Sequence, residues 1–127
     1  MKIIKTGVTR WVLLIGKYAI KFPSFYDYRH FLQGILGNDQ EQHWYRMFKW
    51  TKKLCPVLWC SWGCLIIVMP RVQVLTDQEC RDGKLAHIDI DEFLRIEPDE
   101  ESSFPCEKKS DSFGWLDGRL VIIDYGS

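Results

Sequence analysis

Two apolar runs separated by Gly16-Lys17 constrain the fold of this chain more than any other feature. The first run, GVTRWVLLI at residues 7–15, is rich in Val, Leu, Ile and Trp, and the second covers residues 18–22. Branched and aromatic side chains favour strands, and a two-residue break that contains glycine favours a tight turn. The pattern predicts a β-hairpin that ends at Pro23.

A second hairpin is predicted in the middle of the chain. The stretches VLWCS and CLIIVMP, both within residues 57–70, are separated by Trp62-Gly63. Between the two hairpins, residues 24–36 and 39–52 show helical spacing of their apolar side chains, and Gly37-Asn38 predicts a break between two helices. Two pairs of strands with helical cover predict an antiparallel sheet and an α+β fold.

The second half of the chain gives weaker signals. Residues 76–79 fit a capping box, and residues 85–96 fit either a short helix or an extended segment. The acidic, polar stretch at 97–103 predicts an exposed loop. A turn at Asp117-Gly118 precedes a final strand at residues 119–123.

Composition limits the class of protein. A chain of 127 residues with 46% hydrophobic side chains is long enough for one compact domain. Lys plus Arg equals Asp plus Glu at 17 each, a balance that argues against nucleic acid or an anionic membrane as partner. The longest apolar run, at 64–70, is far shorter than the roughly 20 residues that span a bilayer. We expect a soluble, cytoplasmic protein.

The five cysteines are an odd number, which favours free thiols in a reducing compartment over a disulfide framework. Cys55, Cys60 and Cys64 also have spacings that admit a zinc site. They fall within a strand pattern, however, so buried thiols are the favoured interpretation.

Three charged residues occupy positions that suit phosphate chemistry. Lys21 ends an apolar strand, Glu41 follows on a helix, and Asp124 directly follows the last apolar strand. A lysine held by a glutamate can neutralise phosphate oxygens, and a strand-end aspartate can hold a divalent metal. Each residue alone also fits a surface role. Their order along the chain favours the combined interpretation.

At these residues the chain resembles the protein-kinase-like superfamily. YAIK at 18–21 resembles the family's VAIK strand, DYG at 124–126 resembles its DFG motif, and Glu41 falls where the family's lysine-pairing glutamate lies. The resemblance implies a cleft for ATP and Mg, with Lys21 and Glu41 at the phosphates and Asp124 at the metal.

The resemblance extends to the hinge between the two lobes of the family. The stretch CLIIVMPRV at 64–72 matches the strand that enters the hinge, with Met69 in the gatekeeper place. By this alignment Pro70 offers its carbonyl to an adenine edge and Val72 offers its amide and carbonyl. Proline has no N–H, and none is needed at position 70.

The family's catalytic loop is changed in this chain. Aligned on the strand before DYG, residues 105–112 take its place, with Glu107 for the aspartate and Ser112 for the metal-binding asparagine. Lys109 matches a lysine common in that loop, and Asp111 is a second acidic candidate beside Ser112. The resemblance therefore implies catalytic residues at Glu107, Lys109 and Asp111, and metal ligands at Asp124 and Ser112, but with weakened chemistry.

Two further departures shape the functional hypotheses. The family's glycine-rich loop is reduced to Gly7, and the chain stops soon after Asp124. We expect one domain over residues 1–127, with an N-lobe at 1–70 and a hinge with a reduced C-lobe at 71–127. The same pattern is similar to compact kinase-like chains of bacteria and phages.

Three functions stay open at this level. The first is a non-catalytic module that binds or inhibits another protein. The second is an ATP- and Mg-dependent phosphotransferase acting on a protein or small-molecule hydroxyl. The third is a small α+β protein whose motif matches are accidental. A protein partner is expected, a nucleotide and a homodimer are further partners to test, and no membrane is expected.

Overall fold

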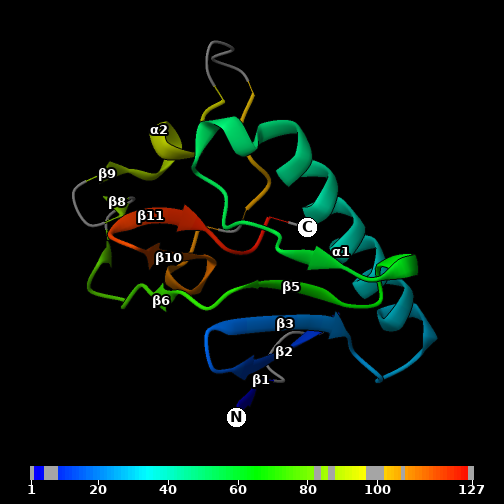
Figure 1. Ribbon diagram of the computed structural model, residues 1–127. Coiled ribbons are helices and arrows are strands. Elements are labelled where there is room, and N and C mark those ends of the chain that lie inside the picture. The colour runs from blue at the N-terminus through cyan, green and yellow to red at the C-terminus, as the bar shows by residue number, and fades with distance from the viewer. Residues whose placement is uncertain are drawn as a thin grey trace.

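The computed structural model describes residues 2–4, 9–81, 84–85, 88–96, 102–106 and 108–125 (Figure 1). Its helices are α1 (Tyr28–Phe48), α2 (Ile90–Leu94) and the 3-10 turns η1 (Lys49–Thr51), η2 (Trp62–Cys64) and η3 (Ser110–Ser112). Its strands are β1 (Lys2–Ile4), β2 (Arg10–Ile15), β3 (Tyr18–Pro23), β4 (Trp59–Cys60), β5 (Ile67–Pro70), β6 (Gln73–Val74), β7 (Cys80–Arg81), β8 (Lys84–Leu85), β9 (Ile88–Asp89), β10 (Phe113–Leu116) and β11 (Arg119–Ile122). The predicted α+β class is confirmed.

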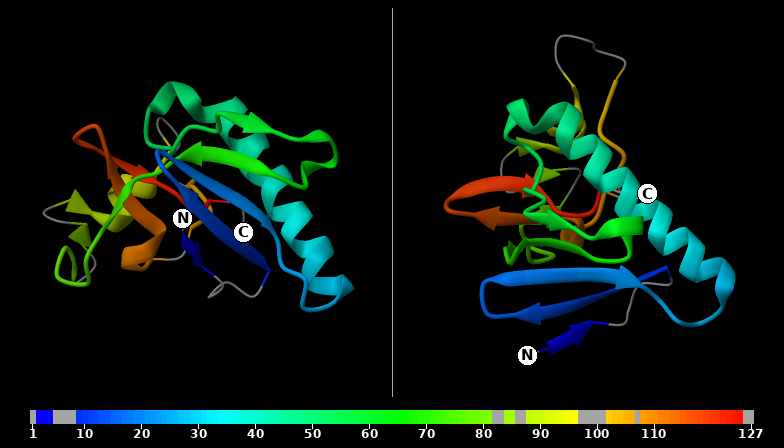
Figure 2. Two further views of the ribbon diagram at one scale, coloured as in Figure 1. Left: turned by 60° about the horizontal axis from the view of Figure 1, so that its bottom comes forward. Right: turned by 45° about the vertical axis from the view of Figure 1, so that its right-hand side comes forward.

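The first half of the chain forms a five-stranded antiparallel sheet in the order β1-β2-β3-β5-β4. Both predicted hairpins are present, β2-β3 around Gly16 and β4-β5 around Gly63, and each of these glycines has a positive φ. The strand β1 was not predicted and adds an edge next to β2. Helix α1 runs along one face of this sheet (Figure 2).

One long helix replaces the two that the sequence predicts. The side chain of Asp27 caps α1 by accepting a hydrogen bond from the His30 amide at 2.9 Å. The helix then continues without a break through Gly37-Asn38, so the predicted interruption there is wrong. Glycine and asparagine lower helix propensity, but tertiary contacts override such small terms.

Those contacts explain why small and polar residues interrupt the apolar pattern of α1. A Cβ atom added to Gly34 would lie 2.4 Å from the carbonyl oxygen of Thr9 and 2.7 Å from the Cα of Pro23. Asn38 is fully buried and donates from Nδ2 to the carbonyl of Cys64 at 2.9 Å. The helix can therefore approach the hairpins closely only with these residues.

The second half of the chain forms two small antiparallel sheets, β11-β10-β6 and β7-β8-β9. The capping-box residues Thr76 and Glu79 do exchange reciprocal hydrogen bonds, but they close a turn instead of starting a helix. Both alternatives for residues 85–96 occur in part, since β8 and β9 are extended and α2 is a short helix. Part of the predicted acidic loop, residues 97–101, lies outside the described residues.

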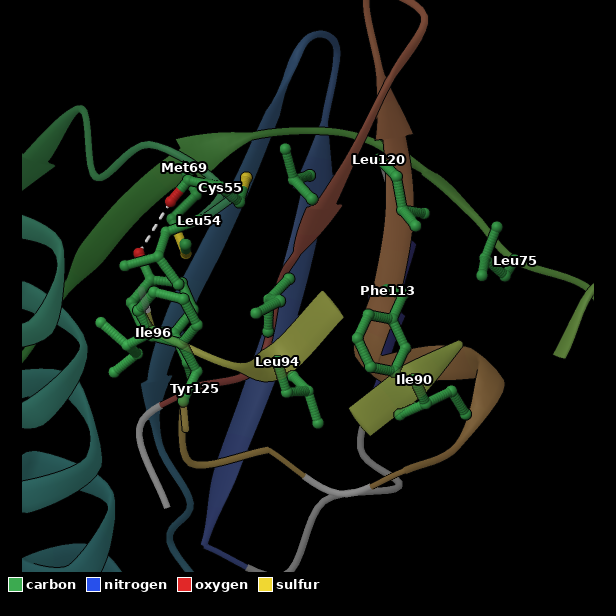
Figure 3. Packing of buried hydrophobic residues seen from close by; sticks show 13 residues of the cluster. Leu54, Cys55, Met69, Leu75, Ile90, Leu94, Ile96, Phe113, Leu120 and Tyr125 are labelled. Carbon is green, nitrogen blue, oxygen red and sulfur yellow. Dashed lines mark hydrogen bonds between the residues drawn. The ribbon is translucent and has the colours of Figure 1, made fainter. Parts of the chain in front are cut away.

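Figure 3 shows the hydrophobic core, which is built mainly from the second half of the chain. Side chains of α1 pack against this core. Trp44 and Phe48 of α1 pack against Phe104 with ring centroids 6.0 and 5.7 Å apart. Chain segments 53–55 and 122 are hydrogen-bonded, because Cys55 N donates to Ile122 O at 2.9 Å and Ile122 N donates to Lys53 O at 2.7 Å. This pairing places the end of β11 beside the segment that follows α1 and η1. Among the described residues, no helix is both long and apolar enough to cross a membrane.

Candidate functional site

Four charged side chains from distant parts of the chain meet between the first sheet and α1; we call them the charge cluster. They are Arg10, Lys21, Glu41 and Asp124. Val12 pairs with Lys21 across β2 and β3, so the alternation of side chains places Arg10 and Lys21 on the same sheet face. Glu41 lies on the buried side of α1. Asp124 follows β11.

Lys21 is bound on all sides by groups of the chain itself. Its ammonium donates to Glu41 Oε1 at 3.0 Å, to Glu41 Oε2 at 2.9 Å, and to the carbonyl of Ile123. A lysine ammonium has three N–H donors. The residue is only 8% exposed. The predicted pairing of Lys21 with Glu41 is therefore present, and it engages the lysine fully.

Arg10 joins the other members of the cluster. Its guanidinium donates to Glu41 at 2.6 Å from Nη1, to Asp124 Oδ1 at 2.7 Å from Nη2, and to Asn38 Oδ1 at 3.3 Å. The planar fork of arginine suits simultaneous contacts with two carboxylates. Arg10 is thus the cation that connects the helix carboxylate with the strand-end carboxylate.

The two cations keep Glu41 ionised although it is fully buried. Burial alone raises the pKa of the carboxyl, but the charges and hydrogen bonds of Arg10 and Lys21 outweigh it and hold the pKa below its usual value. The Tyr125 amide adds a further donor to Glu41 Oε2 at 3.2 Å. Burial lowers the pKa of Arg10, but the charges and hydrogen bonds of Glu41 and Asp124 outweigh burial and raise that pKa above its usual value.

Asp124 is the most open member of the cluster, with its side chain 37% exposed. The next residue, Tyr125, is fully buried in the core and donates its hydroxyl to the Cys55 carbonyl at 2.7 Å (Figure 3). Burial raises the pKa of the Tyr125 phenol, with the nearby Glu41 charge acting in the same direction. The buried tyrosine therefore anchors the backbone that presents Asp124.

The predicted hinge residues connect the first sheet to the second half of the chain. Met69 is buried and pairs with Ala19, and Pro70 pairs with Tyr18 at the end of β5. The half-buried Val72 lies close to β10, since a Cβ atom added to Gly114 would lie 2.4 Å from its Cγ2. These residues form a connection next to the strand of Lys21.

The predicted catalytic-loop residues are divided between different environments. Glu107 lies outside the described residues. Lys109 and Asp111 are exposed and form an ion pair with each other at 3.7 Å. Ser112 is fully buried, and its Oγ has no hydrogen-bond partner within the described residues. Its carbonyl accepts from the Ile123 amide at 2.9 Å, which places Ser112 beside the backbone that leads to Asp124.

The cysteines interpreted as core thiols or zinc ligands do not form one group. Cys55 is buried, which raises the pKa of its thiol to about 12. Cys60 and Cys64 lie with their sulfurs 3.9 Å apart near the β4-β5 turn. Within the described ranges, no group of three or more His, Cys, Asp or Glu side chains is arranged to hold a metal ion.

Arg10 and Asn38 are the site residues that the sequence did not reveal. Asn38 suggested only a helix break, and Arg10 stood unremarked within the first apolar run. One signal was available for Arg10, because a charged side chain inside a strand pattern is costly unless it finds a partner. The identity of that partner, 114 positions away in the case of Asp124, is not contained in the local pattern.

Comparisons with protein-family models, with curated proteins and with solved structures find no match to this chain.

Proposed function

We propose that the chain is a minimal kinase-like protein that acts as a non-catalytic module, binding or inhibiting another protein. The observation that carries the proposal is the internal engagement of Lys21. All three of its N–H donors meet acceptors of the chain, and the residue is almost fully buried. A phosphate would have to displace one of these bonds, at the cost of leaving a buried acceptor unsatisfied.

The contact between Arg10 and Asp124 supports the same proposal. A divalent metal bound to Asp124 would lie close to the Arg10 guanidinium, whose charge repels it. Arg10 already neutralises the carboxylate from 2.7 Å. The second predicted metal ligand, Ser112, offers a neutral hydroxyl, which is a weaker ligand than a carboxylate or an amide oxygen.

An apolar surface near the start of α1 supports the protein-binding part of the proposal. Phe25 and Tyr26 are 66% and 68% exposed, although their rings contact Trp11 at centroid distances of 5.5 and 6.1 Å. Tyr28 and Leu32, four residues apart on α1, are 70% and 58% exposed. Gathered exposed apolar side chains mark interaction surfaces in soluble proteins.

The proposal is tested by thermal unfolding of the purified protein with saturating ATP, with and without Mg. A ligand that binds only the folded state raises the melting temperature, so a nucleotide-binding cleft would be visible. We expect no Mg-dependent shift and no transfer of labelled phosphate to the chain or to a protein panel. A Mg-dependent shift that Asp124→Asn abolishes would overturn the non-catalytic proposal.

Capture of proteins from a bacterial lysate tests the binding part. The wild-type chain and the Asp124→Asn variant should capture the same proteins. A Tyr28→Ser/Leu32→Ser variant, with its fold verified by circular dichroism, should lose them. If neither chain captures anything above an unrelated control protein, the binding part of the proposal is wrong.

The alternative function is an active ATP- and Mg-dependent phosphotransferase. One observation favours it: Lys21 and Glu41 are paired at 2.9 Å, the arrangement that the family needs for phosphate binding. In this alternative Met69, Pro70 and Val72 would contact the adenine, Asp124 and Ser112 the metal, and Glu107, Lys109 or Asp111 the substrate hydroxyl. Rearrangement of Arg10 would have to precede metal binding.

A further inference from the structure

The C-terminal end of α1 and the following turn carry cations and large apolar side chains that all point into solvent. We call this set the basic ridge. It comprises Arg46, Met47, Lys49, Trp50 and Lys52. Met47 is 52% exposed and Trp50 is 61% exposed, while the opposite side of the helix packs Trp44 and Phe48 against the core.

Among the described residues, no carboxylate neutralises the cations of the basic ridge. Arg46, Lys49 and Lys52 form no ion pair with any described residue. The sequence around them has the same character, because residues 42–76 contain five Lys and Arg and no Asp or Glu. The ridge is therefore a local positive surface on a chain whose formal net charge is zero.

Acidic side chains border the ridge on one side. Lys53, which follows it, donates to the Arg95 carbonyl at 3.3 Å and lies over the Phe93 ring at 5.5 Å, so α2 is its neighbour. Figure 1 shows the end of α1 beside α2. The residues Asp91 and Glu92 of α2 are exposed. Exposed carboxylates thus bound the positive surface on the side of α2.

The small extent of the positive surface favours one class of anionic partner over others. The ridge spans seven residues, about 10 Å at the rise of an α-helix. Duplex nucleic acid or an anionic membrane extends well beyond that length and would meet the carboxylates of α2. A short acidic segment of a protein fits within the ridge, and its apolar residues can cover Trp50 and Met47.

We propose that the basic ridge docks a short acidic segment of a partner protein that carries an aromatic or aliphatic residue between its carboxylates. Trp50 provides the apolar anchor, a residue type that dominates binding energy at interfaces. The lysines and Arg46 provide attraction that salt screens. The inference rests on the proposed function as a binding module. It adds a second contact surface, at the opposite end of α1 from Tyr28 and Leu32, and names the chemistry of the partner segment that this surface binds.

The test uses a fluorescein-labelled twelve-residue peptide of Glu and Asp with two Phe residues, titrated with the full chain and followed by anisotropy. We expect saturable binding that weakens at least tenfold between 50 and 300 mM NaCl. Lys49→Glu/Lys52→Glu should weaken binding at least tenfold, and Trp50→Ala should do so without changing the salt dependence. Lys17→Glu, a single charge reversal in the exposed β2-β3 turn, is the control for charge reversal away from the ridge and should bind as the wild type does.

Two further probes decide the partner class. A twelve-nucleotide single-stranded RNA and vesicles with anionic phospholipid should bind more weakly than the peptide. Tighter binding of either probe, absence of peptide binding, or equal loss in Lys17→Glu would overturn the inference. The proposed function is separable from it: if Lys49→Glu/Lys52→Glu still captures the same lysate proteins, the ridge is not the docking site although the module binds protein.

Discussion

The ammonium of Lys21 lies 3.0 and 2.9 Å from the two carboxylate oxygens of Glu41. The Arg10 guanidinium approaches the same carboxylate, at 2.6 Å. Two cations therefore share one fully buried anion, and the second anion that balances the charge is the partly exposed Asp124. The cluster connects β2, β3, α1 and the segment after β11. The contacts that stabilise the fold are therefore the same contacts that a ligand of these charged groups would have to displace.

Arg10→Met should destabilise the fold by about 3–5 kcal/mol. Methionine keeps much of the side-chain volume but removes the cation, and breaking one side of a buried ion network leaves the remaining charges uncompensated. Arg10→Lys should destabilise the fold less, because lysine retains the positive charge. Some loss should remain, because lysine lacks the planar fork with which arginine reaches three acceptors. Urea denaturation followed by circular dichroism measures both.

Arg71→Met is the control for this experiment. Arg71 is exposed, and its backbone amide, which donates to the Lys17 carbonyl at 2.7 Å, is unchanged by the substitution. Its effect should stay within about 0.5 kcal/mol. Equal stability of Arg10→Met and Arg71→Met would contradict the role assigned to Arg10.

The two carboxylates of the cluster should differ in their contribution to stability. Glu41→Gln removes a fully buried anion from two cations, and we expect a loss of about 3–5 kcal/mol in the free energy of unfolding. Asp124→Asn removes an anion that is 37% exposed, where water screens the interaction, so we expect about 1 kcal/mol or less. Chemical denaturation of the two amide variants compares them directly, and a larger loss in Asp124→Asn would refute the assignment.

The sequence predicted three of the four members of this cluster, Lys21, Glu41 and Asp124, for a physical reason. Lys21 and Glu41 are recognisable because each occupies a definite position in a strand or a helix, and YAIK resembles a known motif. Arg10 was missed because its role depends on a contact with Asp124 across 114 positions, and no local pattern encodes it.

The fold shows the same division between local and long-range information. Hairpins with turns at Gly16 and Gly63 follow from local chemistry, and both were predicted. The continuity of α1 through Gly37-Asn38 was not, because close packing against the hairpins decides it. Short strands such as β8 and β9 carry too few residues for a periodic signal.

Acid should remove the stabilisation that Glu41 provides. The pKa of this carboxyl in the folded chain lies below the ordinary value of 4.5, so folding favours its ionised form. The contribution is fully present above 4.5 and is lost as the pH falls through the lower pKa of the folded state. The free energy of unfolding should therefore decrease below about pH 5.

Asp27 and Glu79 also have lowered pKa values, so the acid dependence of the wild type alone does not isolate Glu41. The stability difference between the wild type and Glu41→Gln does isolate it. That difference should be largest near pH 7 and should narrow as the pH falls below 4.5, because the wild type then loses the same negative charge. A constant difference from pH 7 to pH 3 would contradict the lowered pKa of Glu41.

Gly34→Ala should destabilise the chain even though alanine is the better helix former. The added methyl would lie 2.4 Å from the Thr9 carbonyl oxygen and 2.8 Å from the Cβ of Pro23, so backbone must move. Overpacking of this kind costs about 1–3 kcal/mol, more than the gain of up to about 1 kcal/mol in helix propensity.

Gly37→Ala is the matched comparison in the same helix. The atoms nearest to its methyl would belong to the flexible Arg10 side chain, at 3.3 Å or more, so a smaller loss is expected. Thermal unfolding of the two variants ranks them, and a more stable Gly34→Ala would show that α1 does not approach the hairpins this closely.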